Sequence, residues 1–318
     1  MDRRPTMNGV RQAADRLRGI VTETPLLPFD WEGRRFWVKA ECLQQGGSFK
    51  LRGASNRLLL LNAEERGRGV VAFSSGNHAQ GVARAARALG MAATIVMPAD
   101  APAVKVEGTR AAGAEIVFFD RASESREAIG ARLAAEKGAT LVPSFDDVDV
   151  IEGQGSVGVE IAAQLGHAPP AVIIPCGGGG LSSGIALALP ESRIVVVEPE
   201  GWDDMGRSLA LGRIVPVEEP APPSRCDALQ TKLVSPLTFA ALQEAKAEAL
   251  AVSEAEVAAA MAFAFRNLRI VAEPGGAVAL AALLSGKAGD VPDDSVIVVS
   301  GGNVDAALYA EILAAEAR

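Results

Sequence analysis

Three short polar or glycine-rich segments carry residue types that suit a small-molecule site. Residues 47–50 (Gly-Ser-Phe-Lys) end on a lysine, residues 74–78 (Ser-Ser-Gly-Asn-His) form a polar cluster, and residues 177–180 are consecutive glycines. A neutral lysine amine attacks carbonyl carbons, and the apolar Phe49 beside Lys50 would lower the lysine pKa by desolvation. Together the segments predict a nucleophile, a polar clamp and an anion cradle.

The glycine segment has two interpretations. It follows the apolar run at residues 171–174, which is typical of a turn from a strand into a helix. Free N–H groups and the positive end of a helix dipole bind phosphate at such a turn. A nucleotide-binding Rossmann protein is the rival, with Glu198 as its ribose-binding acid. Its fingerprint requires a third glycine where Ser182 or Ser183 stands, so the match is incomplete.

Composition excludes several classes of partner. The chain has 318 residues, 49% of them hydrophobic, with a net charge of −8 and no long run of Lys and Arg, so nucleic acid is not expected to bind. The three cysteines are scattered, which suits a reducing compartment and predicts a cytoplasmic protein. The uncharged stretch at residues 161–190 contains prolines and glycines that would break a spanning helix, so no membrane association is expected.

Short apolar runs recur between alanine-rich stretches of helical character. They lie at residues 70–73, 93–97, 115–119, 140–142, 172–174, 194–197 and 296–299. Near-continuous apolar strands joined by helices predict an α/β fold with open, mostly parallel sheets flanked by helices. Ligands bind beyond the carboxyl ends of such strands. The segments 74–78, 177–180 and 300–303 follow three of these runs, so we expect them to meet in one crevice.

Four longer motifs carry a family resemblance. They are residues 47–54 (GSFKLRGA), 74–81 (SSGNHAQG), 175–184 (PCGGGGLSSG) and 300–305 (SGGNVD). They resemble the threonine dehydratase and serine racemase family of fold type II pyridoxal-phosphate enzymes, from about residue 11 to the C-terminus. The resemblance implies a two-domain fold like that of the tryptophan synthase β subunit and a homodimer. Residues 1–62 and 148–318 would form the large cofactor-binding domain, and residues 63–147 the small mobile domain.

The resemblance also assigns roles around the cofactor, pyridoxal 5′-phosphate. Lys50 would bind it covalently and later move the Cα proton of the substrate, and Phe49 would pack against its ring. Asn77 would approach the ring hydroxyl, and the Ser300 hydroxyl would meet the pyridine nitrogen. A neutral hydroxyl cannot stabilise a protonated pyridine nitrogen as an aspartate can, so the ring withdraws electrons less strongly. Elimination at Cβ is then favoured over a long-lived carbanion at Cα. The phosphate would be bound by the N–H groups of Gly177, Gly178, Gly179 and Gly180.

A second set of residues would bind the amino acid substrate. The substrate carboxylate is expected at Ser74, Ser75, Gly76 and His78. Arg126 resembles a family arginine that approaches carboxylate substrates, although a solvated arginine on a helix is the alternative. The Ser75 hydroxyl could exchange a proton on the face of Cα opposite Lys50. It could instead bind carboxylate or cap the next helix.

A metal site is implied by a third match. Glu198, the backbone carbonyl of Trp202, and Asp204 have the spacing at which the serine racemase branch holds Mg²⁺ or Ca²⁺, hard ions that prefer oxygen ligands. A bare pair of surface carboxylates is the alternative interpretation.

The predicted function is that of a pyridoxal-phosphate-dependent dehydratase, or ammonia-lyase. It would convert a small 3-hydroxy amino acid, namely threonine, serine or 3-hydroxyaspartate, into a 2-oxo acid and ammonia. The alternative is a serine or aspartate racemase that uses Lys50 and Ser75 on opposite faces of Cα. The Rossmann nucleotide-binding protein remains the remote alternative.

Overall fold

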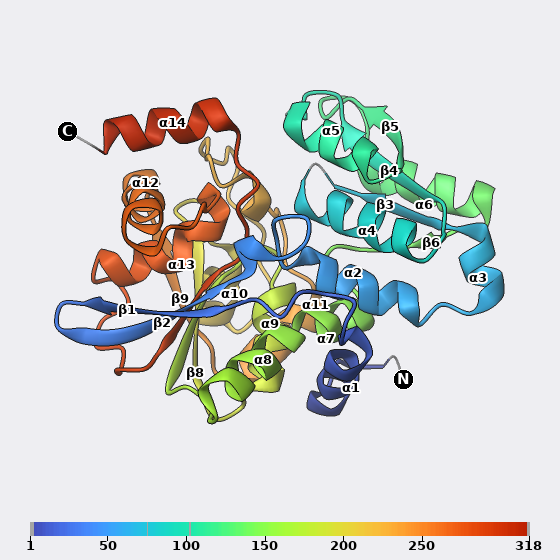
Figure 1. Cartoon of the computed structure of the whole chain (residues 1–318). Coiled ribbons are helices and arrows are strands. Elements are labelled where there is room, and N and C mark those ends of the chain that lie inside the picture. The colour runs from blue at the N-terminus through green and yellow to red at the C-terminus, as the bar shows by residue number, and fades with distance from the viewer. Residues whose placement is uncertain (1–2, 75, 102, 317–318) are drawn as a thin grey trace.

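Two sheets organise the chain (Figure 1). Over the described residues, 3–74, 76–101 and 103–316, the computed structural model has one sheet of six strands and one of four. Their strand orders are β1-β2-β10-β7-β8-β9 and β5-β4-β3-β6. The strands are β1 (Leu26–Trp31), β2 (Arg34–Ala40), β3 (Val70–Phe73), β4 (Ala93–Pro98), β5 (Glu115–Phe119), β6 (Thr140–Leu141), β7 (Ala171–Pro175), β8 (Arg193–Pro199), β9 (Glu248–Val252) and β10 (Val296–Val299).

Helices fill most of the connections between these strands. The α-helices are α1 (Met7–Leu17), α2 (Lys50–Leu59), α3 (Ala63–Arg68), α4 (Asn77–Ala88), α5 (Ala103–Ala111), α6 (Arg126–Lys137), α7 (Val148–Gln154), α8 (Ser156–Leu165), α9 (Gly180–Ala188), α10 (Asp204–Leu211), α11 (Pro236–Glu244), α12 (Glu254–Phe263), α13 (Pro274–Leu284) and α14 (Ala306–Ala315). Shorter turns are the 3₁₀-helices η1 (Glu41–Leu43) and η2 (Asp227–Leu229) and the π-helix η3 (Ala264–Leu268).

The six-stranded sheet is buried on both faces. Successive side chains of a strand point to opposite faces, so Ile173 of β7 packs in the cluster that contains α12 and α13. Its neighbours Val172 and Ile174 pack in the cluster that contains α8, α9 and α11. Figure 1 shows α12 and α13 on one side of the sheet and α8, α9 and α11 on the other. Burial on both faces explains why these strands are apolar at nearly every position.

The four-stranded sheet has the same layered construction. Ile95 of β4 packs in a cluster with Val82 of α4 and Leu58 of α2. Val96, the next residue, faces the other side and packs with Leu133 of α6. Helix α2 therefore contributes to the core of this sheet while its first residue, Lys50, belongs to one of the predicted functional segments.

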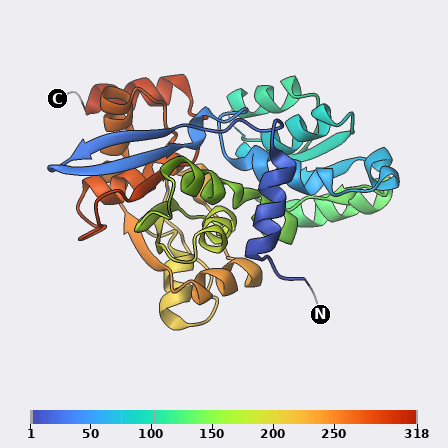
Figure 2. The ribbon, with the colours of Figure 1, turned by 60° about the horizontal axis from the view of Figure 1, so that its bottom comes forward.

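The predicted α/β fold is confirmed, and all seven predicted strands are present. Three strands were not predicted, namely β1, β2 and β9. β1 and β9 are the edge strands of the six-stranded sheet. Edge strands tolerate proline and are less apolar, which explains Pro28 in β1 and the weak signal of β9. β1 pairs antiparallel with β2, and Figure 2 shows this hairpin extending to one side of the molecule.

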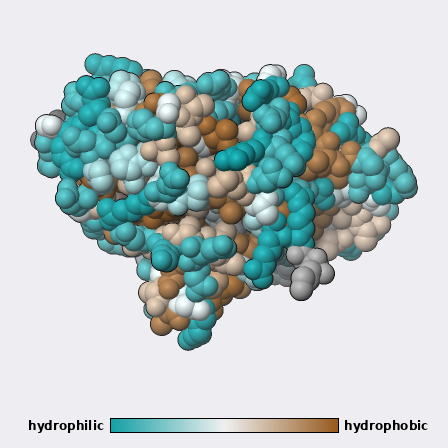
Figure 3. All heavy atoms as spheres, turned by 90° about the horizontal axis from the view of Figure 1, so that it is seen from below, coloured by the Kyte–Doolittle hydropathy of each residue, from teal (hydrophilic) through white to brown (hydrophobic). Residues whose placement is uncertain are grey.

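The uncharged stretch at residues 161–190 is divided between the end of α8, the strand β7 and the helix α9. Within the part of the chain that the structure describes, no helix has both the length and the apolar character needed to cross a membrane. On the face drawn in Figure 3, hydrophobic patches are separated by hydrophilic residues. The stretch thus forms parts of two helices and one strand and is no single spanning helix, as its prolines and glycines predict.

Candidate active site

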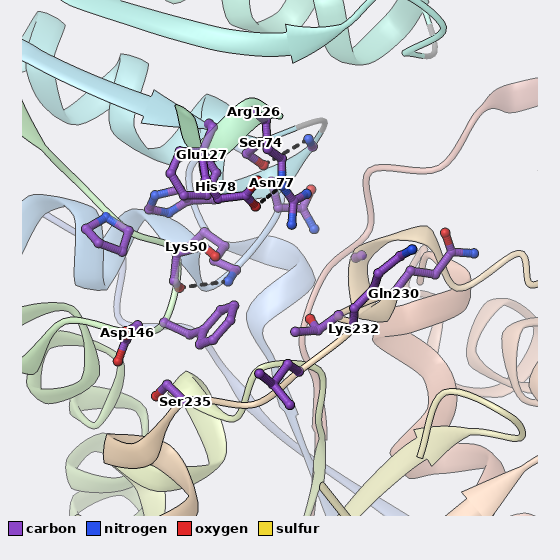
Figure 4. Close-up of a pocket in the computed structure, with 18 of the residues that line it drawn as sticks. Lys50, Ser74, Asn77, His78, Arg126, Glu127, Asp146, Gln230, Lys232 and Ser235 are labelled. Atoms are coloured by element: carbon purple, nitrogen blue, oxygen red, sulfur yellow. Dashed lines mark hydrogen bonds and ion pairs between the residues drawn. The ribbon is translucent and has the colours of Figure 1, made fainter. Parts of the chain in front are cut away.

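A cavity of about 500 Å³ is lined by residues from both sheet units (Figure 4). Figure 4 shows Ser74, Asn77, His78 and Arg126 on one side and Ser235 on the other, with Lys50 between them. Six predicted site residues line it: Lys50, Ser74, Gly76, Asn77, His78 and Arg126. Ser75, the predicted second proton-exchanging residue, lies outside the described residues. Segments far apart in the sequence therefore meet in one place.

Lys50 stands at the start of α2 with its amine in the cavity. Its Nζ donates a hydrogen bond to the backbone oxygen of Ser144 at 3.2 Å and lies 5.0 Å from the ring centroid of Phe49. Burial lowers the pKa of the Lys50 amine to about 8, although the nearby Glu273 carboxylate acts in the opposite direction. A substantial fraction of the amine is therefore neutral and nucleophilic at mildly basic pH.

A buried ion cluster anchors helix α2 just behind Lys50. Arg52, fully buried, donates from Nε and Nη2 to the two oxygens of Glu41 at 2.8 Å each. It also donates to both oxygens of Glu160, at 2.5 and 2.8 Å, and Lys39 Nζ donates to the same carboxylate at 2.6 Å. Two cations thus balance two carboxylates, which is the condition for burying such charges. The cluster fixes the backbone that carries Lys50.

The predicted phosphate cradle lies behind Phe145, a side chain of the cavity wall. A Cβ on Gly178 would stand 2.4 Å from the Phe145 ring. Gly179, the N-cap of α9, has φ +85°, and a Cβ there would be 2.7 Å from Met205 Cε. Residues with side chains do not fit this loop. Because N–H groups in the first turn of a helix have no intrahelical partner, the loop offers donors to an anion.

The predicted residues Phe49 and Ser300 are joined through the backbone. Phe49 N donates to Ser300 O at 3.2 Å, and Ser48 forms an isolated bridge with Gly301. Both side chains are buried. The end of β10 is therefore held against the segment that carries Lys50.

Asn77 is held by Glu273, which was not predicted, and by Asn303, which lies in the predicted segment 300–303. Its Nδ2 donates to Glu273 Oε1 at 2.5 Å, and its Oδ1 accepts from Asn303 Nδ2 at 2.9 Å. Burial raises the pKa of Glu273 to about 7, while the charge of Lys105 acts in the opposite direction. The available signal was an acid directly before Pro-Gly-Gly in an otherwise apolar segment at residues 270–284. These contacts fix the side-chain amide of Asn77 in one orientation.

His78 is buried and neutral. Its Nε2 lies 2.9 Å from the backbone oxygen of Val142, and its Nδ1 has no hydrogen-bond partner among the described residues. Burial and the nearby Lys50 charge lower the pKa of His78 to about 3. The imidazole therefore carries no positive charge at physiological pH. His167, the other histidine of the sequence, is exposed and lies in the connection between α8 and β7.

Charged groups that line the cavity are paired with one another. Lys105 of α5 forms an ion pair with Asp227 of η2, which links the four-stranded sheet unit to the rest of the chain. Arg126 Nε lies 2.8 Å from Glu127 Oε1, and its guanidinium carbon is 5.7 Å from the Phe73 ring centroid. The Arg126 side chain is 40% exposed, so it is free to turn toward a ligand.

The predicted metal residues form a buried carboxylate pair. Glu198 and Asp204 are fully buried, so the pair does not lie on the surface. Glu198 accepts from the N–H groups of Met205 and Gly206 at 3.0 and 2.8 Å, and burial raises its pKa well above the usual value. Neither oxygen of Asp204 has a partner among the described residues, and burial raises its pKa to about 7.

The third predicted metal ligand, Trp202, lies in the connection between β8 and α10, and its indole N–H donates to Pro222 O at 2.9 Å. The described residues contain no group of three or more His, Cys, Asp and Glu side chains arranged to hold a metal ion. An orphaned buried carboxylate nevertheless fits a hard cation, because such ions are held by carboxylate and carbonyl oxygens.

Comparisons with known proteins agree with this geometry. Residues 17–301 match the family described as pyridoxal-phosphate dependent enzyme. The chain is 45% identical over 312 residues to an L-threo-3-hydroxyaspartate ammonia-lyase from a Pseudomonas species, covering 96% of this chain and 97% of that protein. It is 41% identical over 317 residues to the protein of the same name from Saccharomyces cerevisiae, covering 97% of this chain and 96% of that protein.

A solved structure of maize serine racemase superposes with a TM-score of 0.92 at 34% identity, covering 99% of this chain and 98% of that one. The resemblance read from the motifs is therefore confirmed, and with it the fold type II architecture. Because residues 17–301, most of the chain, match this family, the chain belongs to the pyridoxal-phosphate dependent enzymes.

Proposed function

We propose that this protein is an ammonia-lyase that converts L-threo-3-hydroxyaspartate into a 2-oxo acid and ammonia. The observation that carries the proposal is the Lys50 amine, held in a cavity with its pKa lowered to about 8. The two relatives that bear this activity in their names support the choice of substrate. Arg126 on the cavity wall, 40% exposed, suits a substrate with a second carboxylate.

The residues present fit pyridoxal 5′-phosphate. We assign its phosphate to the N–H groups of Gly177, Gly178, Gly179 and Gly180, where only glycine fits at two positions. Lys50 supplies the amine for its aldehyde, Asn77 retains a free Nδ2–H for its ring hydroxyl, and Ser300 offers a neutral hydroxyl to its ring nitrogen. When bound, the cofactor withdraws electrons from Cα of the substrate, which makes the Cα proton acidic.

The chain's own groups would then perform the proton transfers and the positioning. Lys50 Nζ, once free, takes the proton from Cα, and the Ser144 carbonyl 3.2 Å away holds it in place. Ser74 Oγ accepts a hydrogen bond from Gly76 N at 3.1 Å and lies in the loop to which we assign the substrate carboxylate. The electron pair left at Cα forms a double bond to Cβ, and the hydroxyl leaves Cβ as water by taking the proton that Lys50 removed from Cα. Hydrolysis of the resulting enamine yields the 2-oxo acid and ammonia.

Release of 2-oxo acid from purified holoenzyme tests the proposal. We expect release from L-threo-3-hydroxyaspartate to exceed that from the erythro and D stereoisomers and from L-threonine and L-serine. A racemase is the second candidate, favoured by the likeness to maize serine racemase. Chiral chromatography of serine and aspartate after incubation would detect it. Racemisation without 2-oxo acid would refute the lyase assignment.

The pH dependence of cofactor attachment follows from Lys50. Only the neutral amine attacks an aldehyde, and burial lowers the pKa of Lys50 to about 8. Below this pH, the rate of attachment to cofactor-free protein should rise about tenfold per pH unit, and above it the rate should level off. Stopped-flow absorbance after mixing with pyridoxal phosphate measures this rate. A rate that still rises at about pH 10 would contradict the lowered pKa.

We propose further that Glu198, the carbonyl of Trp202, and Asp204 hold Mg²⁺ or Ca²⁺. Binding to the folded state alone stabilises a protein, so millimolar Mg²⁺ should raise the thermal midpoint of unfolding and a chelator should reverse the rise. Asp204→Asn keeps the size of the side chain but replaces the carboxylate by a neutral amide. It should abolish the rise of the thermal midpoint with Mg²⁺. An equal shift in this variant would argue against the site.

Three properties of the whole protein are also part of the proposal. Residues 63–147 would form a small domain that closes over the substrate, against a large domain of residues 1–62 and 148–318. All strands of the four-stranded sheet lie between residues 70 and 141, which supports that division. The protein would be a cytoplasmic homodimer, and the buried free thiols at Cys42, Cys176 and Cys226 suit a reducing compartment. Sedimentation equilibrium tests the dimer.

A further inference from the structure

His78 is the one histidine in the wall of the cavity, and it is 2% exposed. It lies in the first turn of α4, one residue after Asn77 and beside the loop that contains Ser74 and Gly76. Figure 4 places its ring on the same side of the cavity as Ser74 and Asn77, close to Lys50. Any group that His78 binds inside the cavity therefore belongs to the substrate region.

The tautomer of His78 is set by its contact with Val142. A carbonyl oxygen only accepts hydrogen bonds, so the nitrogen 2.9 Å from Val142 O must carry the proton. That nitrogen is Nε2, which leaves Nδ1 as an unprotonated acceptor. The low pKa of the ring means that Nδ1 does not gain a proton at physiological pH. Val142 thereby converts His78 into a group that can only accept from a ligand.

Nδ1 is buried and lacks a hydrogen-bond donor within the described residues. Leaving a buried polar atom unpaired costs free energy, and such an atom in a site wall points to a missing ligand group. A carboxylate is itself only an acceptor and would be repelled by Nδ1. The ligand group must instead be a donor, and in a 3-hydroxy amino acid bound through its amine the remaining donor is the hydroxyl.

We propose that His78 Nδ1 accepts a hydrogen bond from the 3-hydroxyl of the substrate and so selects hydroxylated amino acids. This inference rests on the proposed function. It assigns the substrate carboxylate to the neighbouring loop and the hydroxyl to His78. Because Nδ1 has no proton to give, His78 orients the departing hydroxyl, and the proton that converts the hydroxyl to water is the one that Lys50 took from Cα.

The kinetic test compares ligands that differ only by the hydroxyl. In the holoenzyme, His78→Gln preserves an N–H donor near Val142 O but removes the acceptor at Nδ1. We expect kcat/KM for L-threo-3-hydroxyaspartate to fall about 10-fold, which corresponds to one hydrogen bond to a buried group. The inhibition constant of L-aspartate, which lacks the hydroxyl, should stay within about twofold. The matched variant His78→Asn places an acceptor near the position of Nδ1. It should therefore retain more of the preference for L-threo-3-hydroxyaspartate over L-aspartate than His78→Gln does.

The outcomes separate this inference from the function on which it rests. A parallel loss of L-aspartate inhibition in His78→Gln would overturn the hydroxyl role, because it would mean that His78 acts on the carboxylate or on the loop. Absence of 2-oxo acid from the unaltered holoenzyme would instead refute the proposed function. Unchanged inhibition by L-aspartate also shows that the variant is folded.

A spectroscopic measurement tests the tautomer without turnover. The chain has two histidines, so ¹⁵N-histidine labelling resolves His78 from the exposed His167. We expect His78 in the holoenzyme to show the neutral form with Nε2 protonated from pH 6 to pH 8. A protonated or Nδ1–H form of His78 in this range would overturn the proposal.

Discussion

Lys50→Ala should reduce ammonia release at least about 10³-fold, because one side chain supplies both the cofactor-binding amine and the base for Cα. The cavity offers no equivalent substitute in its described wall: Lys105 is paired with Asp227, and Lys232 is paired with Glu219 at 2.8 Å. Initial rates of 2-oxo acid release measure the loss. Borohydride reduction followed by peptide mass analysis should locate the cofactor on Lys50 in the unaltered enzyme only.

Lys246→Ala is the matched control, since Lys246 is exposed and does not line the cavity. It removes the same charge and the same number of methylene groups, and its rate should be unchanged. Residual activity of Lys50→Ala within about tenfold of the unaltered enzyme would exclude Lys50 as the base, since positioned bases contribute at least about 10² in rate.

Gly179→Ala should weaken binding of pyridoxal phosphate by about 10- to 100-fold, the range expected when a charged hydrogen bond is lost. Gly179 has φ +85°, and a Cβ would meet Met205 Cε at 2.7 Å and Thr238 Cβ at 2.9 Å. The loop must move, and its N–H groups then turn away from the anion they are proposed to bind. Equilibrium dialysis of the cofactor against apo-protein measures the change.

Gly166→Ala is the control that separates the effect of backbone strain from the effect of the steric clash at Gly179. Gly166 has φ +80°, but a Cβ there would have nothing within 4 Å. Both variants should lose about 1 to 2 kcal/mol of unfolding free energy from the left-handed backbone alone. Only Gly179→Ala should lose cofactor affinity. Equal cofactor affinity in the two variants would mean that the loop at residues 177–180 does not bind the phosphate.

The sequence by itself determined the sheets and the segments that bear the chemistry. Strands that are buried on both faces must be apolar at nearly every position, so β3, β4, β7, β8 and β10 are readable as short apolar runs. The polar and glycine-rich segments stand out because they interrupt those runs at strand ends. Residues 74–78, 177–180 and 300–303 were identified in this way, and Lys50 was identified by the apolar Phe49 beside it.

Only the tertiary structure decided which side chains surround these groups. Glu273 reaches Asn77 across 196 residues of sequence, and Val142 sets the tautomer of His78 across 64. Such pairings depend on sheet order and on the packing between units, which no local pattern of residue types encodes. β1 and β9 were missed for a related reason: these edge strands are only partly buried, and their exposed positions leave no continuous apolar run.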